Sequence, residues 1–256
     1  MVVPLPETPD GTASEAAPST LEAQYGPCDA AVIGPGLGPG EETGCLAARF
    51  VDGSPLPTVI DAGALVAWGW AGHRPGPGPR VLTPHPGEMA GLTGLGGDAI
   101  ERDREAIAGR FAADWGSVLV LKGPRTLVAG DGLYLNTAGT PGLGTAGSGD
   151  VLAGIIGGLL ARVSSPTAAA VWGVHLHAVA GEIADRERGT DGMMASDVVE
   201  CLPEASSTPD RPPSPAMWAT RRRGTTPPRS PSSRSPRRGP RARNRPATPA
   251  GANRMT

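Results

Sequence analysis

The stretch NTAGTPGLGTAGSGDVLAGIIGGLLA, from Asn136 to Ala161, carries most of the information on the fold and its site. Its first half is rich in glycine, and its second half repeats apolar residues at the spacing of one helical face. A glycine-rich loop that opens onto a helix presents unpaired backbone N–H groups and the positive end of the helix dipole, and this arrangement binds phosphate. We expect Ser148 to cap the helix.

Asp150 falls in the first turn of this predicted helix, beside the expected phosphate site. A carboxylate there can accept the proton of a hydroxyl group that attacks the phosphate. For an isolated Gly-Ser-Gly-Asp, a plainer interpretation is about equally good: the glycines form a tight turn, and the aspartate favours the helix N-terminus. The long glycine-rich approach from Thr137 favours the phosphate site.

Upstream, short β-branched and apolar runs alternate with helical patterns, which predicts parallel strands joined by helices. The expected strands are Ala30–Ile33, Thr58–Ile60, Arg80–Leu82 and Val118–Leu121. The first is followed by Gly34–Gly38, which matches neither common nucleotide fingerprint and by itself indicates only a turn that a ligand can approach. We predict an α/β fold with a mostly parallel central sheet flanked by helices, and ligands bind at the carboxyl edge of such a sheet.

Further elements follow from the same patterns. Apolar spacing predicts an amphipathic surface helix from Asp98 to Trp115 and an alanine-rich helix from Ala168 to Asp185. Two short strands, Thr126–Val128 and Leu133–Leu135, flank Gly130-Asp131-Gly132 and predict a β-hairpin.

Charge divides the chain of 256 residues into two parts. The part through Ala205 holds 11 basic and 24 acidic residues, a net charge of −13 that disfavours DNA binding. The part from Ser206 holds 12 arginines, 11 prolines and one acid, a net charge of +11 without apolar periodicity. We predict a domain over residues 1–205 and a disordered Arg/Pro/Ser-rich tail over residues 206–256. A nucleic-acid arm is the alternative for the tail, but no aromatic residue follows Trp218 to stack on bases, so an unselected extension is favoured.

Single polar residues at strand ends are candidates for binding. Lys122, the only lysine, follows the strand Val118–Leu121, where its ammonium group could meet a nucleotide phosphate or could be a snorkelling lysine. His85 lies between two prolines after another strand, which favours a binding role. His175 and His177 lie two positions apart and point to different sides of a helix, so we interpret them as structural and expect no metal site.

Cysteine usage and hydropathy bear on the compartment. The three cysteines, Cys28, Cys45 and Cys201, lack both C-x-x-C spacing and an even count, which indicates neither a disulfide framework nor a zinc site. The longest apolar run, Val151–Leu160, is shorter than the roughly 20 residues of a membrane span. No signal peptide is recognised at the start of the sequence. We expect a cytoplasmic protein.

Several motifs, in order along the chain, together resemble one family. They are IGPGLG (Ile33–Gly38), VIDAGAL (Val59–Leu65), LTPHPGEM (Leu82–Met89), LKGPRT (Leu121–Thr126), TAGSGDVLAGIIGGLLA (Thr145–Ala161) and ASDVVECLPEA (Ala195–Ala205). The match is collinear from about Val2 to Ala205, and the spread of independent motifs makes it specific. The chain resembles the ADP-dependent (S)-NAD(P)H-hydrate dehydratases, which have a ribokinase-like fold.

The resemblance implies repair of damaged nicotinamide cofactor. ADP, or else ATP, would phosphorylate the hydroxyl group of the S-epimer of NAD(P)H hydrate in the presence of Mg²⁺, and loss of phosphate would restore NADH or NADPH. The implied partners are the hydrate and the adenine nucleotide, with a homo-oligomer and functional coupling to an NAD(P)H-hydrate epimerase as further expectations. Neither a membrane nor a nucleic acid is expected as a partner.

By the same resemblance, Gly36 and His85 would contact the hydrate, and Asp150 would both bind it and act on its hydroxyl group. Two segments would hold the nucleotide. The first comprises Lys122, Gly123, Pro124, Arg125 and Thr126, and the second comprises Thr140, Pro141, Gly142, Leu143, Gly144, Thr145, Ala146, Gly147, Ser148 and Gly149.

Three departures from the family pattern qualify this reading. An earlier glycine-rich segment and a helix normally precede the strand near Met1, Gly63 stands where a second Asp is usual, and the tail replaces a terminal helix after Ala205. We therefore expect an N-terminally truncated domain. The alternatives are a ribokinase-like small-molecule kinase acting on a vitamin-precursor alcohol, and an inactive remnant or basic-tail interaction protein.

Overall fold

The computed structural model describes residues 2–14, 16–38, 40–70 and 78–208. Six strands form one sheet in chain order: β1 (Ala31–Ile33), β2 (Thr58–Ile60), β3 (Arg80–Leu82), β4 (Val118–Leu121), β5 (Leu127–Ala129) and β6 (Leu133–Leu135). The first four pair in parallel, and the last two form an antiparallel hairpin on β4. The predicted sheet is thereby confirmed, although β1 and β5 each begin one residue later than predicted.

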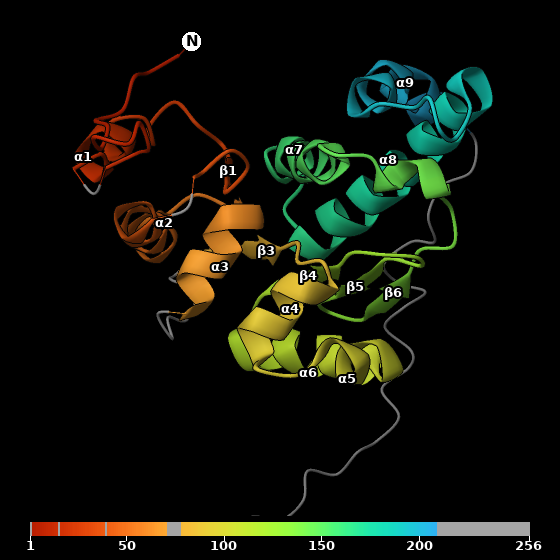
Figure 1. Cartoon of the computed structure of the whole chain (residues 1–256), viewed down its shortest axis with the longest axis horizontal. Helices are drawn as coiled ribbons and strands as arrows, with labels where there is room; N and C mark the ends of the chain where they lie inside the picture. Colours follow the sequence, from red (N-terminus) through yellow and green to blue (C-terminus); the bar gives the residue numbers. More distant parts are fainter. Residues whose placement is uncertain (1, 15, 39, 71–77, 209–256) are drawn as a thin grey trace, which may run out of the picture. The chain divides into compact units, whose positions relative to one another are not determined.

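Helices cover both faces of this sheet (Figure 1). The first face carries α2 (Glu41–Gly53), α3 (Ala62–Trp70), α4 (Pro86–Thr93), α5 (Gly97–Arg102) and α6 (Arg104–Trp115), and α1 (Pro18–Glu22) packs on α2. The second face carries α7 (Ser148–Leu160) and α8 (Pro166–Arg188), and α9 (Ala195–Ser207) packs on both of these helices. Within the part of the chain that the structure describes, no helix has the length and apolarity that a membrane crossing requires.

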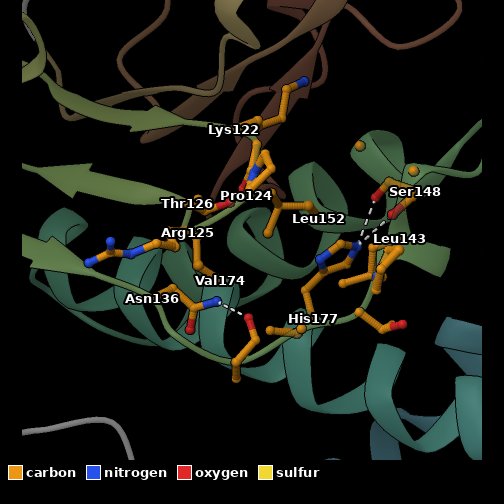
Figure 2. A pocket seen from close by; sticks show the side chains of 18 of the residues that line it. Lys122, Pro124, Arg125, Thr126, Asn136, Leu143, Ser148, Leu152, Val174 and His177 are labelled. Atoms are coloured by element: carbon orange, nitrogen blue, oxygen red, sulfur yellow. Dashed lines mark hydrogen bonds between the residues drawn. The ribbon is translucent and has the colours of Figure 1, made fainter. Parts of the chain in front are cut away.

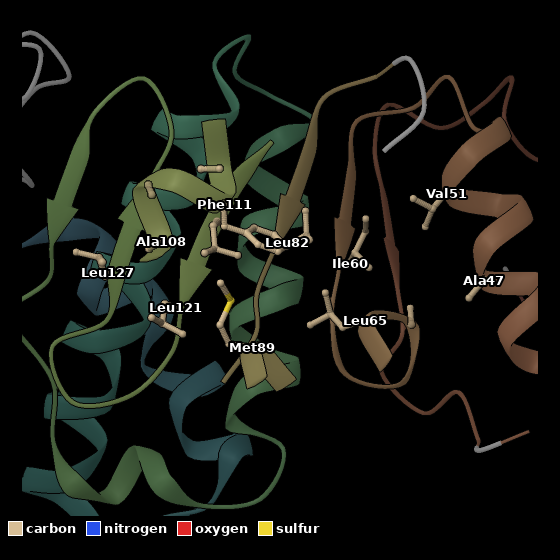
Figure 3. Close-up of a cluster of buried hydrophobic side chains, with 14 of the residues drawn as sticks. Ala47, Val51, Ile60, Leu65, Leu82, Met89, Ala108, Phe111, Leu121 and Leu127 are labelled. Carbon is tan, nitrogen blue, oxygen red and sulfur yellow. The ribbon is translucent and has the colours of Figure 1, made fainter. Parts of the chain in front are cut away.

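Alternating strand residues explain the two cores, because successive side chains of a strand point to opposite faces. Ile60, Leu82 and Leu121 pack with the helices of the first face, in the cluster that Figure 3 shows. Their neighbours Val59 and Val81 pack against α7 and α8. The strands are buried on both faces, as parallel strands with helices on either side require.

The prediction of one helix from Asp98 to Trp115 is wrong, because this segment forms two helices, α5 and α6. Asp103, with φ −140° and ψ 48°, separates α5 from α6. Next to the break, the Arg104 guanidinium donates to the carbonyls of Leu121 and Lys122, both at 3.1 Å. This contact with the end of β4 is tertiary, and apolar periodicity does not report it.

Two helix starts also differ from the prediction. Ser148 is the first residue of α7 rather than its cap, because Gly147 occupies the cap position in the left-handed conformation. The helix predicted from Ala168 to Asp185 runs from Pro166 to Arg188, because the Ser165 hydroxyl accepts a hydrogen bond from Ala168 N at 3.2 Å. The predicted disorder of the tail lies, beyond Thr208, outside the described residues.

Candidate active site

A cavity of about 510 Å³ lies beside the end of β4 and the first turn of α7 (Figure 2). Its wall combines the segment after β4, the loop between β6 and α7, and one side of α8. The lining residues are Lys122–Thr126, Asn136–Pro141, Leu143, Gly144, Ser148, Gly149, Leu152, Val174, His177 and Ala178. The two segments named from the sequence as nucleotide-binding therefore meet in space.

Most of the predicted nucleotide-binding residues line this cavity, and four do not: Gly142, Thr145, Ala146 and Gly147. Gly142 is instead buried against Met193, whose Cε lies 2.9 Å from the position that a Cβ would take. Sequence reasoning missed Asn136–Gly139, which adjoin the predicted segment, and also missed the residues contributed by α7 and α8. Nothing in the local pattern of α8 marks His177 as facing a cavity.

The first turn of α7 is a candidate anion site. Gly147 has φ 84°, a conformation that glycine adopts without strain. The first i→i−4 hydrogen bond at this end runs from Val151 N to Gly147 O at 3.1 Å. Among the described residues, no backbone carbonyl accepts from the amides of Gly149 and Asp150, which precede it, so both are available to an anion at the positive end of the helix. Asp150 lies in this turn as predicted, exposed and outside the cavity lining.

Lys122 places its ammonium group at this turn, 3.4 Å from the position of a Cβ on Gly149. It is ion-paired with Asp61, whose Oδ1 lies 2.8 Å from Nζ and also accepts from the Thr83 hydroxyl at 2.7 Å. The Asp61 side chain is only 1 % exposed, and its Oδ2 has no hydrogen-bond partner among the described residues. The snorkelling alternative therefore does not describe Lys122, because its charge is turned toward a buried carboxylate.

His85 and Glu88 lie near Lys122, outside the lining of the cavity. His85 caps α4: its Nδ1 accepts from the amides of Gly87 and Glu88, and its own amide donates to Glu88 Oε2 at 2.8 Å. Glu88 Oε2 also lies 3.7 Å from Lys122 Nζ. His85 does not line the cavity, but this chain of contacts connects it to Lys122.

Gly36 lies in the exposed turn after β1, with φ 73°, and it does not line the cavity either. The turn is held close to the end of β2, because a Cβ on Gly34 would overlap the carbonyl oxygen of Asp61. Gly63 has a related role, since Leu37 O lies 2.7 Å from the position of its Cβ. An aspartate at position 63 would require this turn to move.

The loop that lines the cavity is fastened to α8. The Gly139 amide donates to Glu182 Oε1 at 2.6 Å, and the Thr140 hydroxyl donates to Asp185 Oδ2 at 2.9 Å. Leu143 packs directly over Gly181 of the same helix. One side of α8 thus sets the position of the backbone between β6 and α7.

His177 completes the wall. Its Nε2 lies 3.0 Å from both the hydroxyl and the backbone oxygen of Ser148. Burial lowers the pKa of His177 to about 4, so the imidazole is neutral near pH 7. The contact with Ser148 agrees with the interpretation of His177 as a structural residue. His177 also lines the cavity, which the sequence did not indicate.

A mixed sheet that is parallel over its first four strands, with helices on both faces and a glycine-rich loop at a helix N-terminus, defines a ribokinase-like α/β protein. Residues 4–204 match the family model described as NAD(P)H-hydrate dehydratase. The chain belongs to this family.

Two relatives and one solved structure illustrate the similarity. The bifunctional NAD(P)H-hydrate repair enzyme Nnr of Moorella thermoacetica is 44% identical over 210 residues, covering 79% of this chain and 39% of that protein. The ADP-dependent (S)-NAD(P)H-hydrate dehydratase of Xanthomonas campestris is 44% identical over 185 residues, covering 72% of this chain and 63% of that protein. The solved structure is the ADP/ATP-dependent NAD(P)H-hydrate dehydratase of Bacillus subtilis, co-crystallised with ATP/Mg²⁺ and soaked with CoA. It is 33% identical, with a TM-score of 0.63, and the match covers 70% of this chain and 65% of that chain. The match spans less than two thirds of the length of each of these proteins.

Proposed function

We propose that the protein uses ADP or ATP to dehydrate the S-epimer of NAD(P)H hydrate back to NADH or NADPH. The observation that carries the proposal is the candidate anion site at the cavity wall, where Gly149 and Lys122 both line the cavity and the ammonium group of Lys122 lies at the first turn of α7. Membership of the family supports the choice of substrate. The segments Lys122–Thr126 and Thr140–Gly149 would hold the nucleotide around this point.

In the proposed reaction, Asp150 accepts the proton of the hydrate hydroxyl as that oxygen attacks the terminal phosphorus of the nucleotide. The new O–P bond forms while the bond to the departing nucleotide oxygen breaks, so that ADP yields AMP. The carbon–oxygen bond of the phosphorylated hydrate then breaks, and phosphate leaves with the electron pair. Loss of a proton from the neighbouring carbon restores the double bond of the nicotinamide ring.

The hydrate would lie on the side of Lys122 opposite to the nucleotide, in contact with Gly36 and His85. His85 is fixed for this purpose, because its Nδ1 is used in capping α4 and its Nε2 edge remains at the surface, 3.6 Å from Glu88 Oε1. Lys122 would then lie between the two substrates and offset the negative charge of the transferred phosphate.

Mg²⁺ fits this site as a partner of the nucleotide rather than as a resident ion. Among the described residues, no three His, Cys, Asp or Glu side chains gather as a metal cluster. Mg²⁺ commonly binds through one or two carboxylates together with substrate phosphates. Asp61, with its unpartnered Oδ2, and Glu88 would supply those carboxylates, and the bound ion would neutralise phosphate charge.

The partners follow from the proposed reaction. Only one hydrate epimer would be consumed, so an NAD(P)H-hydrate epimerase would extend the repair to the other epimer, and the Moorella relative is named as bifunctional. Because the proposed reaction uses adenine nucleotide and yields reduced cofactor, we place the protein in the cytoplasm. We also propose that it forms a homo-oligomer.

Purified protein incubated with S-hydrate, ADP and Mg²⁺ tests the proposal. We expect equal amounts of inorganic phosphate and of product absorbing as reduced nicotinamide. A small-molecule kinase would instead leave a stable phosphate ester on an alcohol and release no phosphate. An inactive remnant would give neither product, and a nucleic-acid-binding protein would show affinity that falls steeply with salt.

A further inference from the structure

The hydrogen bonding of His177 determines which of its ring nitrogens carries the proton. Nε2 lies 3.0 Å from the backbone oxygen of Ser148, and a carbonyl oxygen can only accept. Nε2 must therefore carry the hydrogen, which it shares between the carbonyl and the Ser148 hydroxyl at 3.0 Å. A neutral imidazole has a single N–H group, so Nδ1 is left as an acceptor.

This acceptor faces the cavity. Figure 2 shows the second ring nitrogen of His177 turned away from Ser148, toward the space between Val174 and Pro124. Nδ1 makes no hydrogen bond with any described residue, and it is not among the described buried atoms that lack a partner, so it is open to the cavity.

Other polar side chains of the wall are already engaged within the protein. Asn136 Nδ2 donates to Ala138 O at 2.8 Å, the Thr126 hydroxyl donates to Gly123 O at 3.0 Å, and the Thr140 hydroxyl donates to Asp185. His177 differs from these three residues, because its Nδ1 can only accept a hydrogen bond and remains available to a ligand. A ligand that brought an acceptor to this point would leave both acceptor atoms without a hydrogen bond, which is unfavourable where they are shielded from water.

We propose that His177 is a specificity-determining residue whose Nδ1 accepts a hydrogen bond from the nucleoside half of the bound nucleotide. This inference rests on the proposed function, since it takes the cavity to be the nucleotide site. The nucleoside of ADP offers this donor chemistry in two places, the ribose hydroxyls and the exocyclic amine of adenine. Because Ser148 belongs to the turn that would hold phosphate, the same histidine couples the position of that turn to recognition of the nucleoside.

Calorimetric titration of the full chain with ADP, purine riboside 5′-diphosphate, 2′-deoxy-ADP and 3′-deoxy-ADP, all with Mg²⁺ and without hydrate, tests the inference. We expect one of the three analogues to bind about fivefold more weakly than ADP, the effect of one neutral hydrogen bond. The analogue that loses affinity identifies the donor, an amine or one particular hydroxyl. The unmodified protein suffices for this measurement, so it does not depend on the folding of a variant.

Two variants sharpen the result. In His177→Phe the weak analogue should bind as well as ADP does, because the acceptor is gone. In the matched control His175→Phe, on the same helix but outside the cavity lining, the fivefold difference should persist. Equal binding of all four nucleotides to the unmodified protein, or an analogue defect that survives in His177→Phe, would overturn the inference. Absence of any ADP binding would instead overturn the proposed function, and this inference with it.

Discussion

The pairing of Lys122 with Asp61 joins residues 61 positions apart and makes the lysine important for stability as well as for binding. We predict that Lys122→Met lowers the free energy of unfolding in urea by about 3 kcal/mol, because it leaves a buried carboxylate without its cation. Nucleotide affinity should also fall, by about 1.5 to 3 kcal/mol, through loss of a charge-assisted contact.

The double variant Lys122→Met/Asp61→Asn separates the two effects. It removes the uncompensated charge, so stability should recover while nucleotide affinity stays low. A double variant as unstable as Lys122→Met alone would show that packing, and not charge, accounts for the loss. Nucleotide affinity unchanged by Lys122→Met in calorimetry would remove the lysine from the proposed anion site.

Asp150 is proposed as the base, and its exposure at the first turn of α7 leaves it free to meet a second substrate. We predict that Asp150→Asn lowers turnover by about 10² to 10⁴-fold, the contribution of a positioned general base. Nucleotide affinity should change little, because the backbone amides of the turn remain. Asp114→Asn, an exposed change on α6, is the matched control and should keep full turnover. A loss of less than about tenfold in Asp150→Asn would exclude the aspartate as the base.

At the scale of elements, Arg80 joins α2 to the sheet. The side chain is 1 % exposed, and its guanidinium donates to the carbonyls of Val51, Ser54 and Leu56 at 2.8, 2.7 and 2.8 Å. Burial lowers the pKa of Arg80 from its ordinary value, although the three acceptors hold the charged form. These carbonyls belong to the end of α2 and to the connection that leads into β2.

We predict that Arg80→Met lowers the free energy of unfolding by about 3 kcal/mol, since buried carbonyls lose charged donors and relief of the buried charge offsets only part of the loss. Nucleotide affinity should be unchanged, because Arg80 begins β3 and the cavity lies beyond the opposite ends of the strands. Urea denaturation and calorimetry measure the two quantities. Arg49→Met, exposed on α2, is the control and should be neutral. An unchanged denaturation midpoint in Arg80→Met would refute the proposed role of Arg80 in fastening α2 to the sheet.

At the scale of the whole molecule, the strongly basic part of the chain begins after α9. Ala205 is 3 % exposed in α9, and the Thr208 hydroxyl donates to its carbonyl at 2.8 Å, so a cut after Ala205 would damage the helix. We predict that a chain ending at Thr208 keeps the unfolding temperature and nucleotide affinity of the full chain. The reason is that the basic part, with a net charge of +11 from Ser206 onward, lacks the apolar periodicity that packing on the domain would need.

Thermal unfolding and calorimetry at two salt concentrations check this prediction. Attraction between the two oppositely charged parts would be screened by salt. An unfolding temperature that falls on truncation, and falls most at low salt, would therefore mean that residues 209–256 contribute to the stability of the domain. The matched control is the full chain at the same salt concentrations.

Local sequence determined the strands and the glycine-rich turn at the start of α7, because both depend on neighbouring residues. β-branched runs select the extended backbone, and glycines before the helix at Ser148 leave its first amides free whatever surrounds them. The two segments that we propose to hold the nucleotide could also be selected from the sequence, since each is continuous. Periodicity located the helices but not the break at Asp103, where Arg104 turns to the end of β4.

Only the tertiary structure decided which side chains meet across the fold. His177 lies 29 positions from Ser148, and Glu182 lies 43 positions from Gly139, yet both contacts form because α8 packs beside α7 and the loop before it. The tautomer of His177, and with it the acceptor that faces the cavity, follows from that packing. Sequence spacing reports which residues share a helix face, whereas partners on different elements are set by how those elements pack.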